Sequence, residues 1–339
     1  MREILTALTI ILLVTVSVSS ISPNQTSHVP SFNGATAYQY LLDQCDFGPR
    51  PPGSINLSLC RTMLSESFEA AGWNVTFQNF TYRDVECVNL VVTWHSSQTS
   101  SIILGAHYDT RPEATSDPDA ANRSKPILGA NDGASGVAVL LELSSSLPEE
   151  VRSSVEIVLF DAEDSGSING WNWIQGSTYY VSQLTQTRRA SVKAMVLVDM
   201  VGDENLRLPR ESSSTKSLQN AIWSIAGQLG HNDTFLDTFG GSVTDDHSPF
   251  LDAGIPAVDL IQVPFPWYWH TLEDTPDKCS ATSLEAVGQV LEVFVVEQVT
   301  NGLTFPVDDY TFIILGVVVV LAVTIILLIW RRRKDFTHF

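Results

Sequence analysis

Histidine and acidic residues follow four strand-like segments of this 339-residue sequence. The segments are apolar runs at 102–106, 155–160, 194–198 and 258–261. The carboxyl ends of parallel strands lie at one edge of a sheet, so side chains that follow them can meet there. Imidazole nitrogen together with carboxylate oxygen is a donor set typical of zinc. The pattern predicts a zinc centre with the following candidate ligands: His107, Asp132, Asp164, Asp199 and His270.

Asp132 lies among small residues in the segment 128–136, Leu-Gly-Ala-Asn-Asp-Gly-Ala-Ser-Gly. The glycines allow tight turns and close approach of the backbone. An apolar helical run begins at Val137, so Asp132 is expected where a loop enters a helix. Considered alone, Asp132 is either a helix cap or a metal ligand. The other histidines and acids favour the ligand.

The same residues predict hydrolysis by a metal-activated water. Two zinc ions about 3.5–4 Å apart can share one bridging carboxylate, and Asp132 suits that position. Glu163 is the candidate general base for a water whose pKa the metal lowers. Asp109, which follows His107 closely, is placed to orient its imidazole. Each residue taken singly is also compatible with an ordinary structural role.

Aromatic residues adjoin His270 in the segment 264–270, Pro-Phe-Pro-Trp-Tyr-Trp-His. Trp267 and Trp269 are candidates for the wall of a substrate pocket, as are Trp171 and Trp173. Ordinary packing in the core is the alternative for all of them. The position of Trp269 next to His270 favours the pocket for that residue.

Strand and helix patterns alternate along the chain. Apolar or alternating runs predict strands, and periodic apolar residues predict helices at 35–42, 57–71, 216–229 and 282–298. The last helix begins with Thr282-x-x-Glu285, the pattern of a capping box. This alternation predicts a three-layer α/β/α sandwich around a mostly parallel, mixed sheet.

Acidic residues outnumber basic ones by 38 to 19, which gives a net charge of −19. That balance argues against nucleic acid as a partner. Four cysteines allow three disulfide pairings, and the sequence does not select among them. None has the spacing of metal ligands, so disulfides or buried thiols are expected.

The two ends of the chain resemble targeting segments. Residues 1–20 have the pattern of a signal peptide, and 310–330 form an uncharged run followed by four basic residues. The predicted organisation is a signal peptide at 1–20, a flexible lead-in at 21–34, a hydrolase domain at 35–300, a linker at 301–309, a transmembrane helix at 310–330 and a cytoplasmic tail at 331–339. This organisation predicts a single-pass type I protein of the cell membrane whose hydrolase domain is extracytoplasmic. Six Asn-x-Ser/Thr sites are consistent with a glycoprotein.

Five short motifs together resemble the secreted zinc aminopeptidases of metallopeptidase family 28. They are Gly-Ala-His107-Tyr-Asp109-Thr, Gly-Ala-Asn-Asp132-Gly-Ala-Ser-Gly, Phe-Asp-Ala-Glu163-Asp164, Val-Asp199-Met-Val-Gly and Trp269-His270-Thr271. The resemblance implies the zinc-dependent exopeptidase fold, with His107 and Asp199 on one zinc. It implies Asp164 and His270 on the other zinc, with Asp132 as bridge and Glu163 as base. Many relatives carry Glu where this chain has Asp164, which shifts the metal and can alter its preference.

The resemblance extends to the glutaminyl cyclases, which share the fold and much of the ligand set. The segments 244–251 and 264–271 are especially similar to the C-terminal half of those enzymes. In a cyclase, one zinc is expected to suffice. Glu163 would move a proton from the substrate amine to the leaving amide, with Asp246 assisting through a carboxylate network.

Three functions follow from these residues. The preferred hypothesis is a membrane-anchored zinc aminopeptidase that hydrolyses N-terminal peptide bonds and holds two zinc ions. The first alternative is a glutaminyl-peptide cyclotransferase that forms N-terminal pyroglutamate with one zinc. The second is an ectodomain with the peptidase fold that binds partners without catalysis. The expected partners are peptide substrates and, through one C-terminal helix, a membrane.

Overall fold

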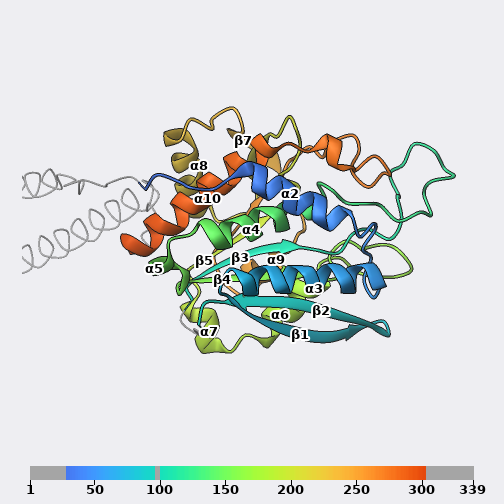
Figure 1. Ribbon diagram of the computed structural model, residues 1–339, viewed down its shortest axis with the longest axis horizontal. Coiled ribbons are helices and arrows are strands. Elements are labelled where there is room, and N and C mark those ends of the chain that lie inside the picture. Colours follow the sequence, from blue (N-terminus) through green and yellow to red (C-terminus); the bar gives the residue numbers. More distant parts are fainter. Residues whose placement is uncertain (1–27, 96–99, 303–339) are drawn as a thin grey trace, which may run out of the picture.

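A six-stranded sheet forms the centre of the structure, a computed structural model that describes residues 28–95 and 100–302 (Figure 1). Its strands lie in the order β1-β2-β4-β3-β5-β8. Their bounds are β1 Asn74–Tyr82, β2 Val85–Thr93, β3 Ile102–His107, β4 Val155–Phe160, β5 Ala194–Val198 and β8 Ala257–Leu260. β3, β4, β5 and β8 run parallel, whereas β2 is antiparallel to both of its neighbours. The sheet is therefore mixed, as predicted.

The four parallel strands are buried at every position. Their continuous apolar sequences are typical of strands that are covered on both faces. β1 is an edge strand, and most of its residues are exposed or half-buried. The β1–β2 hairpin turns at Arg83 and Asp84, both of which have positive φ. Such a two-residue turn matches the twist of a hairpin.

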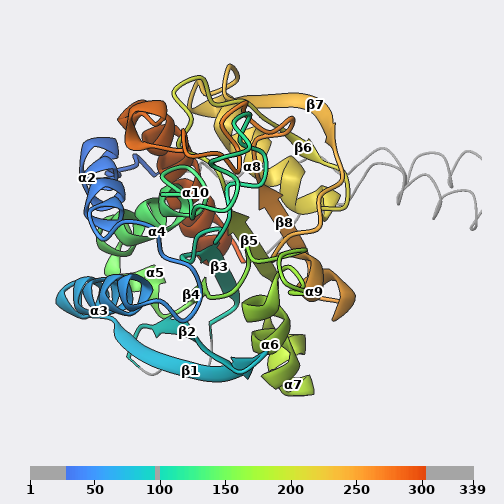
Figure 2. The ribbon, with the colours of Figure 1, turned by 90° about the vertical axis from the view of Figure 1, so that its right-hand side faces the viewer.

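Helices cover both faces of the sheet (Figure 2). Apolar side chains of α2, α3, α4, α8 and α10 share one core with one face of the sheet, and α6 and α9 pack against the other face. The helices are α2 Gly34–Cys45, α3 Ile55–Ala70, α4 Ala134–Ser146, α5 Glu149–Arg152, α6 Gln175–Gln183, α7 Gln186–Ser191, α8 Lys216–Gln228, α9 Ser248–Asp252 and α10 Ala281–Thr300, with a 3₁₀ turn η1 at Pro276–Lys278. The predicted three-layer sandwich is confirmed.

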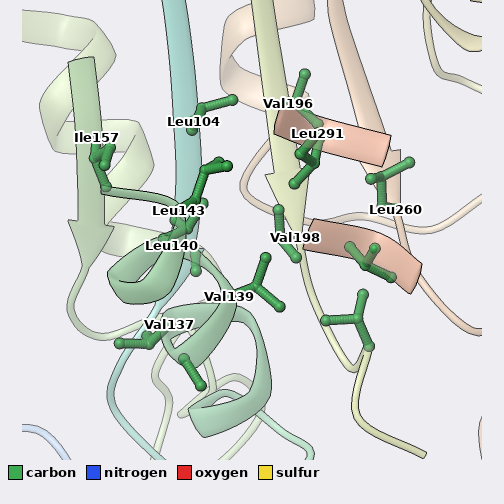
Figure 3. Close-up of a cluster of buried hydrophobic side chains, with 14 of the residues drawn as sticks. Leu104, Val137, Val139, Leu140, Leu143, Ile157, Val196, Val198, Leu260 and Leu291 are labelled. Atoms are coloured by element: carbon green, nitrogen blue, oxygen red, sulfur yellow. The ribbon is translucent and has the colours of Figure 1, made fainter. Parts of the chain in front are cut away.

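Helix α4 lies directly on the sheet, and its side chains are buried on nearly all sides. Val137, Leu140 and Leu143 face the apolar residues of the neighbouring strands in the core (Figure 3). A Cβ atom at Gly136 would meet the backbone oxygen of Val198 at 2.0 Å. Glycine is thus required for α4 to approach β5 this closely, and this contact fixes the loop that precedes α4.

Several local predictions differ from the structure. Helix α10 is capped by Ser280, whose side chain accepts a hydrogen bond from the Ser283 amide, and Thr282 lies inside the helix. A parallel pair of strands, β6 Leu208–Glu211 and β7 Phe235–Gly241, had no sequence prediction. Proline and glycine interrupt the apolar pattern in both segments, so their sequences do not have the pattern typical of a strand.

The predicted membrane location requires correction. Among residues 28–95 and 100–302, no helix is long and apolar enough to cross a membrane. The stretches 1–20 and 310–330, on which the prediction depended, lie outside these described residues. The structure therefore does not support the assignment to a single-pass type I membrane protein.

All four cysteines are buried free thiols: Cys45, Cys60, Cys87 and Cys279. Of the two states expected from the sequence, the structure has the buried thiol. Burial raises the pKa of Cys60 to about 11, so this thiol stays protonated at neutral pH.

Candidate metal centre

The five candidate ligands come together at the carboxyl edge of the parallel strands. His107 is the last residue of β3, and Asp199 directly follows β5. Asp164 lies in the loop after β4, and His270 lies in the loop after β8. Asp132 precedes α4, so the close packing of that helix on the sheet sets its position. All five side chains are buried.

The carboxylate of Asp132 lies between the two histidines. Its Oδ1 is 3.1 Å from Nε2 of His107, and its Oδ2 is 3.5 Å from Nε2 of His270. His107 Nε2 is also 3.2 Å from Asp199 Oδ1, and His270 Nε2 is 3.1 Å from Asp164 Oδ1. Two groups of three possible ligand atoms therefore share Asp132, each with its atoms within 4.8 Å of one another.

These groups fit a zinc site chemically. Histidine nitrogen and aspartate oxygen are ordinary zinc ligands. Oδ2 of Asp164 is buried and has no hydrogen-bond partner among the described residues, which is costly unless another group satisfies it. A cation held by Asp132, Asp164 and His270 would satisfy that oxygen.

The electrostatics of the centre favour a cation. Burial raises the pKa of Asp164 to about 7, although the nearby Arg111 lowers it. Burial lowers the pKa of His270 to about 3, so its ring is neutral and can act as a ligand. Burial also disfavours a charged His107, but hydrogen bonds to the surrounding carboxylates outweigh this and raise its pKa well above the usual value. Carboxylates that attract a proton to His107 would attract a divalent cation in the same way.

The sequence matches the profile of Peptidase family M28 over residues 89–295. This match spans the strands and loops that carry all five candidate ligands. The chain belongs to peptidase family M28. The resemblance predicted from the sequence is thereby confirmed.

Proteins similar to this chain include both glutaminyl cyclases and zinc exopeptidases. A glutaminyl-peptide cyclotransferase of Boiga irregularis is 26% identical, over 81% of this chain and 88% of that protein. Among solved structures, a glutaminyl cyclase of Porphyromonas gingivalis is 30% identical with a TM-score of 0.75. A leucine aminopeptidase precursor of Bacteroides thetaiotaomicron is 34% identical with a TM-score of 0.73. A Zn-dependent exopeptidase of Parabacteroides distasonis is 29% identical with a TM-score of 0.72. The four matches cover 79–81% of this chain and 88–99% of the other protein, so the fold is that of the zinc-dependent exopeptidases.

Arg111 contacts the candidate metal centre of this M28 member, a contact that the sequence did not predict. Its Nη1 donates hydrogen bonds to the backbone oxygen and to Oδ1 of Asp164, each at 3.1 Å. Its guanidinium carbon lies 4.7 Å from the centre of the Trp173 ring, and that ring stacks on His270 at 5.9 Å. The only feature of the sequence that could have indicated this contact is the position of Arg111, a basic residue shortly after the His107 motif.

Asp109 contacts both His107, as the predicted role requires, and the loop that carries Glu163 and Asp164. Its carboxylate accepts hydrogen bonds from the backbone amides of Glu163 and Asp164, at 3.1 and 3.2 Å. Nδ1 of His107 lies 3.2 Å from the backbone oxygen of Asp109, which is within hydrogen-bonding distance. The same nitrogen lies 3.7 Å from Oδ1 of the Asp109 carboxylate. Asp109 therefore orients the loop that carries Glu163 and Asp164 more directly than it orients the histidine.

Asp246 is fully buried, and neither oxygen of its carboxylate has a hydrogen-bond partner among the described residues. Burial and the neighbouring Asp245 raise the pKa of Asp246 well above its usual value. Burial also raises the pKa of Glu163 strongly, and the charges of Asp245 and Asp246 add to this effect. The structure thus brings Asp246 into the electrostatic environment of Glu163.

The two candidate pocket tryptophans differ. Trp269 stacks on the ring of His270 with their centres 3.6 Å apart. Trp267 is 71% exposed and packs edge-on against Tyr268. Trp173, on another loop, stacks on His270 as well. Trp269 and Trp173 are therefore the aromatic residues in direct contact with the candidate metal centre.

Proposed function

We propose that this M28 member is a zinc-dependent glutaminyl-peptide cyclotransferase, which converts an N-terminal glutamine into pyroglutamate and releases ammonia. Similarity to the Boiga irregularis enzyme over 88% of its length supports this function. Similarity to the Porphyromonas gingivalis glutaminyl cyclase supports it as well. The sequence alone favoured an aminopeptidase, and these similarities support that function less well.

The observation that carries the proposal is the set of buried carboxyl groups around Glu163. Burial raises the pKa of Glu163, and the charges of Asp164, Asp245 and Asp246 also raise it. Cyclisation consumes no water, and it requires that a proton pass from the attacking amine to the departing amide nitrogen. A buried carboxyl group with a raised pKa is suited to accept and return such a proton.

Each residue of the centre then has a proposed role. Asp132, Asp164 and His270 would hold zinc, which when bound polarises the carbonyl of the substrate's side-chain amide. The carboxylate of Glu163 would accept a proton from the α-amino nitrogen as that nitrogen bonds to the amide carbon. Glu163 would next donate this proton to the amide nitrogen, whose bond to carbon breaks as ammonia leaves. Asp246 helps to raise the pKa of Glu163 and so would favour the protonated form of Glu163 between the two steps.

Aromatic side chains would keep water away from this reaction. Trp269 and Trp173 both stack on His270 and would form the apolar walls of the pocket. A pocket lined in this way suits a flat carboxamide group. Exclusion of water favours attack by the substrate's own amine over hydrolysis.

A product assay tests the proposal. The purified full-length chain is supplied with zinc and incubated with a Gln-peptide amide and, separately, with a Leu-peptide amide. We expect a pyroglutamyl peptide and ammonia in equal amounts from the first and no reaction with the second. Release of free leucine would contradict the cyclase. Absence of both reactions in a zinc-loaded protein would also contradict it and would favour a binding function.

A zinc exopeptidase is the second candidate, because the two ligand groups that share Asp132 have the arrangement expected of two metal ions. The similarity to the Bacteroides thetaiotaomicron aminopeptidase precursor supports it as well. Metal analysis separates the two functions. A content near two zinc ions per chain favours the exopeptidase, and a content near one favours the cyclase.

A further inference from the structure

A chain of buried hydrogen bonds links the three loops that carry Asp132, Asp199 and His270. Asn131 and Tyr268, which are both buried, lie at the centre of this chain. We propose that Asn131 and Tyr268 are positioning residues that hold the three loops at the spacing required for zinc. We call this chain of hydrogen bonds the loop brace. The inference depends on the metal centre that the proposed function requires.

The loop brace begins in the loop after β5. The backbone amide of Gly202 donates to Oδ1 of Asn131 at 2.8 Å. Nδ2 of Asn131 then donates to the hydroxyl of Tyr268 at 3.2 Å. The Tyr268 hydroxyl donates in turn to Oδ2 of Asp203 at 2.6 Å. The chain starts and ends in the Asp199 loop and passes through the Asp132 and His270 loops.

Each hydrogen bond in the loop brace has only one possible direction. An amide N–H only donates, so the atom of Asn131 that faces Gly202 must be its oxygen. The side-chain nitrogen of Asn131 therefore faces Tyr268, whose hydroxyl is left to donate to the carboxylate of Asp203. The side-chain oxygen and nitrogen of Asn131 and the hydroxyl of Tyr268 thus all have hydrogen-bond partners when the three loops lie as they do in this structure.

Asp274 fixes the backbone beside the loop brace. One oxygen of its carboxylate accepts the Asn131 amide at 2.8 Å, and the other accepts the Asp132 amide at 3.1 Å. Asn131 therefore cannot move without moving Asp132, which follows it directly. Tyr268 lies in the same short loop as His270, and the Thr271 amide donates to the Tyr268 backbone oxygen at 3.1 Å.

Such a brace is expected to act on metal affinity as well as on folding. Zinc affinity depends on ligands that stand at the right spacing before the metal binds, and hydrogen-bonding partners outside the ligand shell are typically worth about 10–100-fold. A buried hydroxyl elsewhere in the fold would contribute to stability without any effect on zinc. This difference separates a positioning residue from a structural one.

Tyr268→Phe, which removes only the hydroxyl, tests the loop brace. Tyr180→Phe is the matched control, because Tyr180 is equally buried and its hydroxyl bonds to the buried carboxylate of Glu156. Zinc affinity of the full-length chain is measured by competition with a chromogenic chelator, and the melting temperature of the zinc-free protein is measured in parallel. We expect both variants to melt at a lower temperature, but only Tyr268→Phe to bind zinc about 10–100-fold more weakly.

The double variant gives a second test. If Asn131 and Tyr268 act as one chain, Asn131→Leu combined with Tyr268→Phe weakens zinc binding by less than the product of the single effects. Wild-type zinc affinity in Tyr268→Phe would overturn the loop brace and leave the proposed function intact. Failure of the wild-type protein to bind zinc would overturn the metal centre and the brace with it.

Discussion

At the scale of single residues, Glu163 is the proton carrier of the proposed reaction. A glutamine at this position keeps the size of the side chain but cannot accept a proton. We expect Glu163→Gln to lower the rate of product formation by about 10²–10⁴-fold while zinc content stays unchanged, as measured by a coupled ammonia assay and by metal analysis. Glu150→Gln, at an exposed position of α5, is the control. An unchanged rate in Glu163→Gln would refute the role of Glu163 as the proton carrier.

Arg111 forms a buried ion pair with the candidate ligand Asp164, with Nη1 and Oδ1 3.1 Å apart. Loss of one partner from a buried ion pair leaves the other charge uncompensated, at a cost of about 3–5 kcal/mol. We therefore expect Arg111→Met to lower the free energy of unfolding of the zinc-free protein by about that amount, measured by urea denaturation.

Arg152→Met is the control for Arg111→Met. The guanidinium of Arg152 also lies over a tryptophan ring, 4.8 Å from the centre of Trp94. Its hydrogen-bond partners within residues 28–95 and 100–302 are backbone oxygens and include no carboxylate. An equal decrease in the free energy of unfolding in the two variants would mean that the ion pair of Arg111 with Asp164 adds no stability beyond the contact with the aromatic ring.

Residue types and spacing predicted the five possible ligands but not their neighbours. The ligands were recognisable because histidine and acidic side chains are unusual at the ends of apolar strands. Asn131, Tyr268 and Asp274 have no such signal, because polar residues in loops are common and only the folded chain shows which of them are buried. The hydrogen bonds from the Glu163 and Asp164 amides to Asp109 could not be predicted either, since these amides belong to a distant loop.

At the scale of elements, the contact between α4 and β5 sets the distance between Asp132 and Asp199. Gly136 permits this contact, since a Cβ atom there would lie 2.0 Å from the Val198 oxygen. We expect Gly136→Ala to destabilise the fold by about 1–3 kcal/mol and to weaken zinc binding, because α4 must move away from the sheet.

A second glycine-to-alanine substitution serves as the control for Gly136→Ala. Gly227 lies in α8, where a Cβ would contact only the end of the Asn232 side chain, at 3.2 Å. Gly227→Ala is expected to be neutral or stabilising by about 0.5–1 kcal/mol, since alanine favours a helix. If Gly136→Ala matched Gly227→Ala in denaturation and zinc affinity, the proposed role of this contact would be wrong.

Periodicity predicted the central strands and the long helices because each buries a continuous apolar face. The cap of α10 was misassigned because two overlapping patterns were present, and only the structure shows that Ser280 accepts the Ser283 amide. Short elements such as β6 carry too few apolar residues for a pattern. Their pairing depends on contacts with distant parts of the chain.

At the scale of the whole molecule, an excess of buried acid links stability to pH and zinc. Burial raises the pKa of Asp164 and Asp245 to about 7, and that of Asp161 and Asp274 to about 8. Between their unfolded pKa values and these raised values, the folded zinc-free protein holds more protons than the unfolded chain. Its free energy of unfolding must therefore fall as the pH rises through this range.

Zinc at the proposed centre would reverse part of this effect, because a zinc ion binds deprotonated carboxylates. We expect the gap in melting temperature between zinc-loaded and chelator-treated protein to widen from about pH 5.5 to about pH 8. Differential scanning fluorimetry in matched buffers measures this gap. A gap that stays constant or narrows with rising pH would contradict the link between the buried acids and the metal.

The most direct test of the central claim is to locate zinc in crystals by anomalous diffraction at the zinc absorption edge. The account predicts a strong anomalous peak bound by Asp132, Asp164 and His270, at about 2.0–2.2 Å from their ligand atoms. A zinc peak elsewhere in a folded chain, with these three side chains unligated, would contradict it.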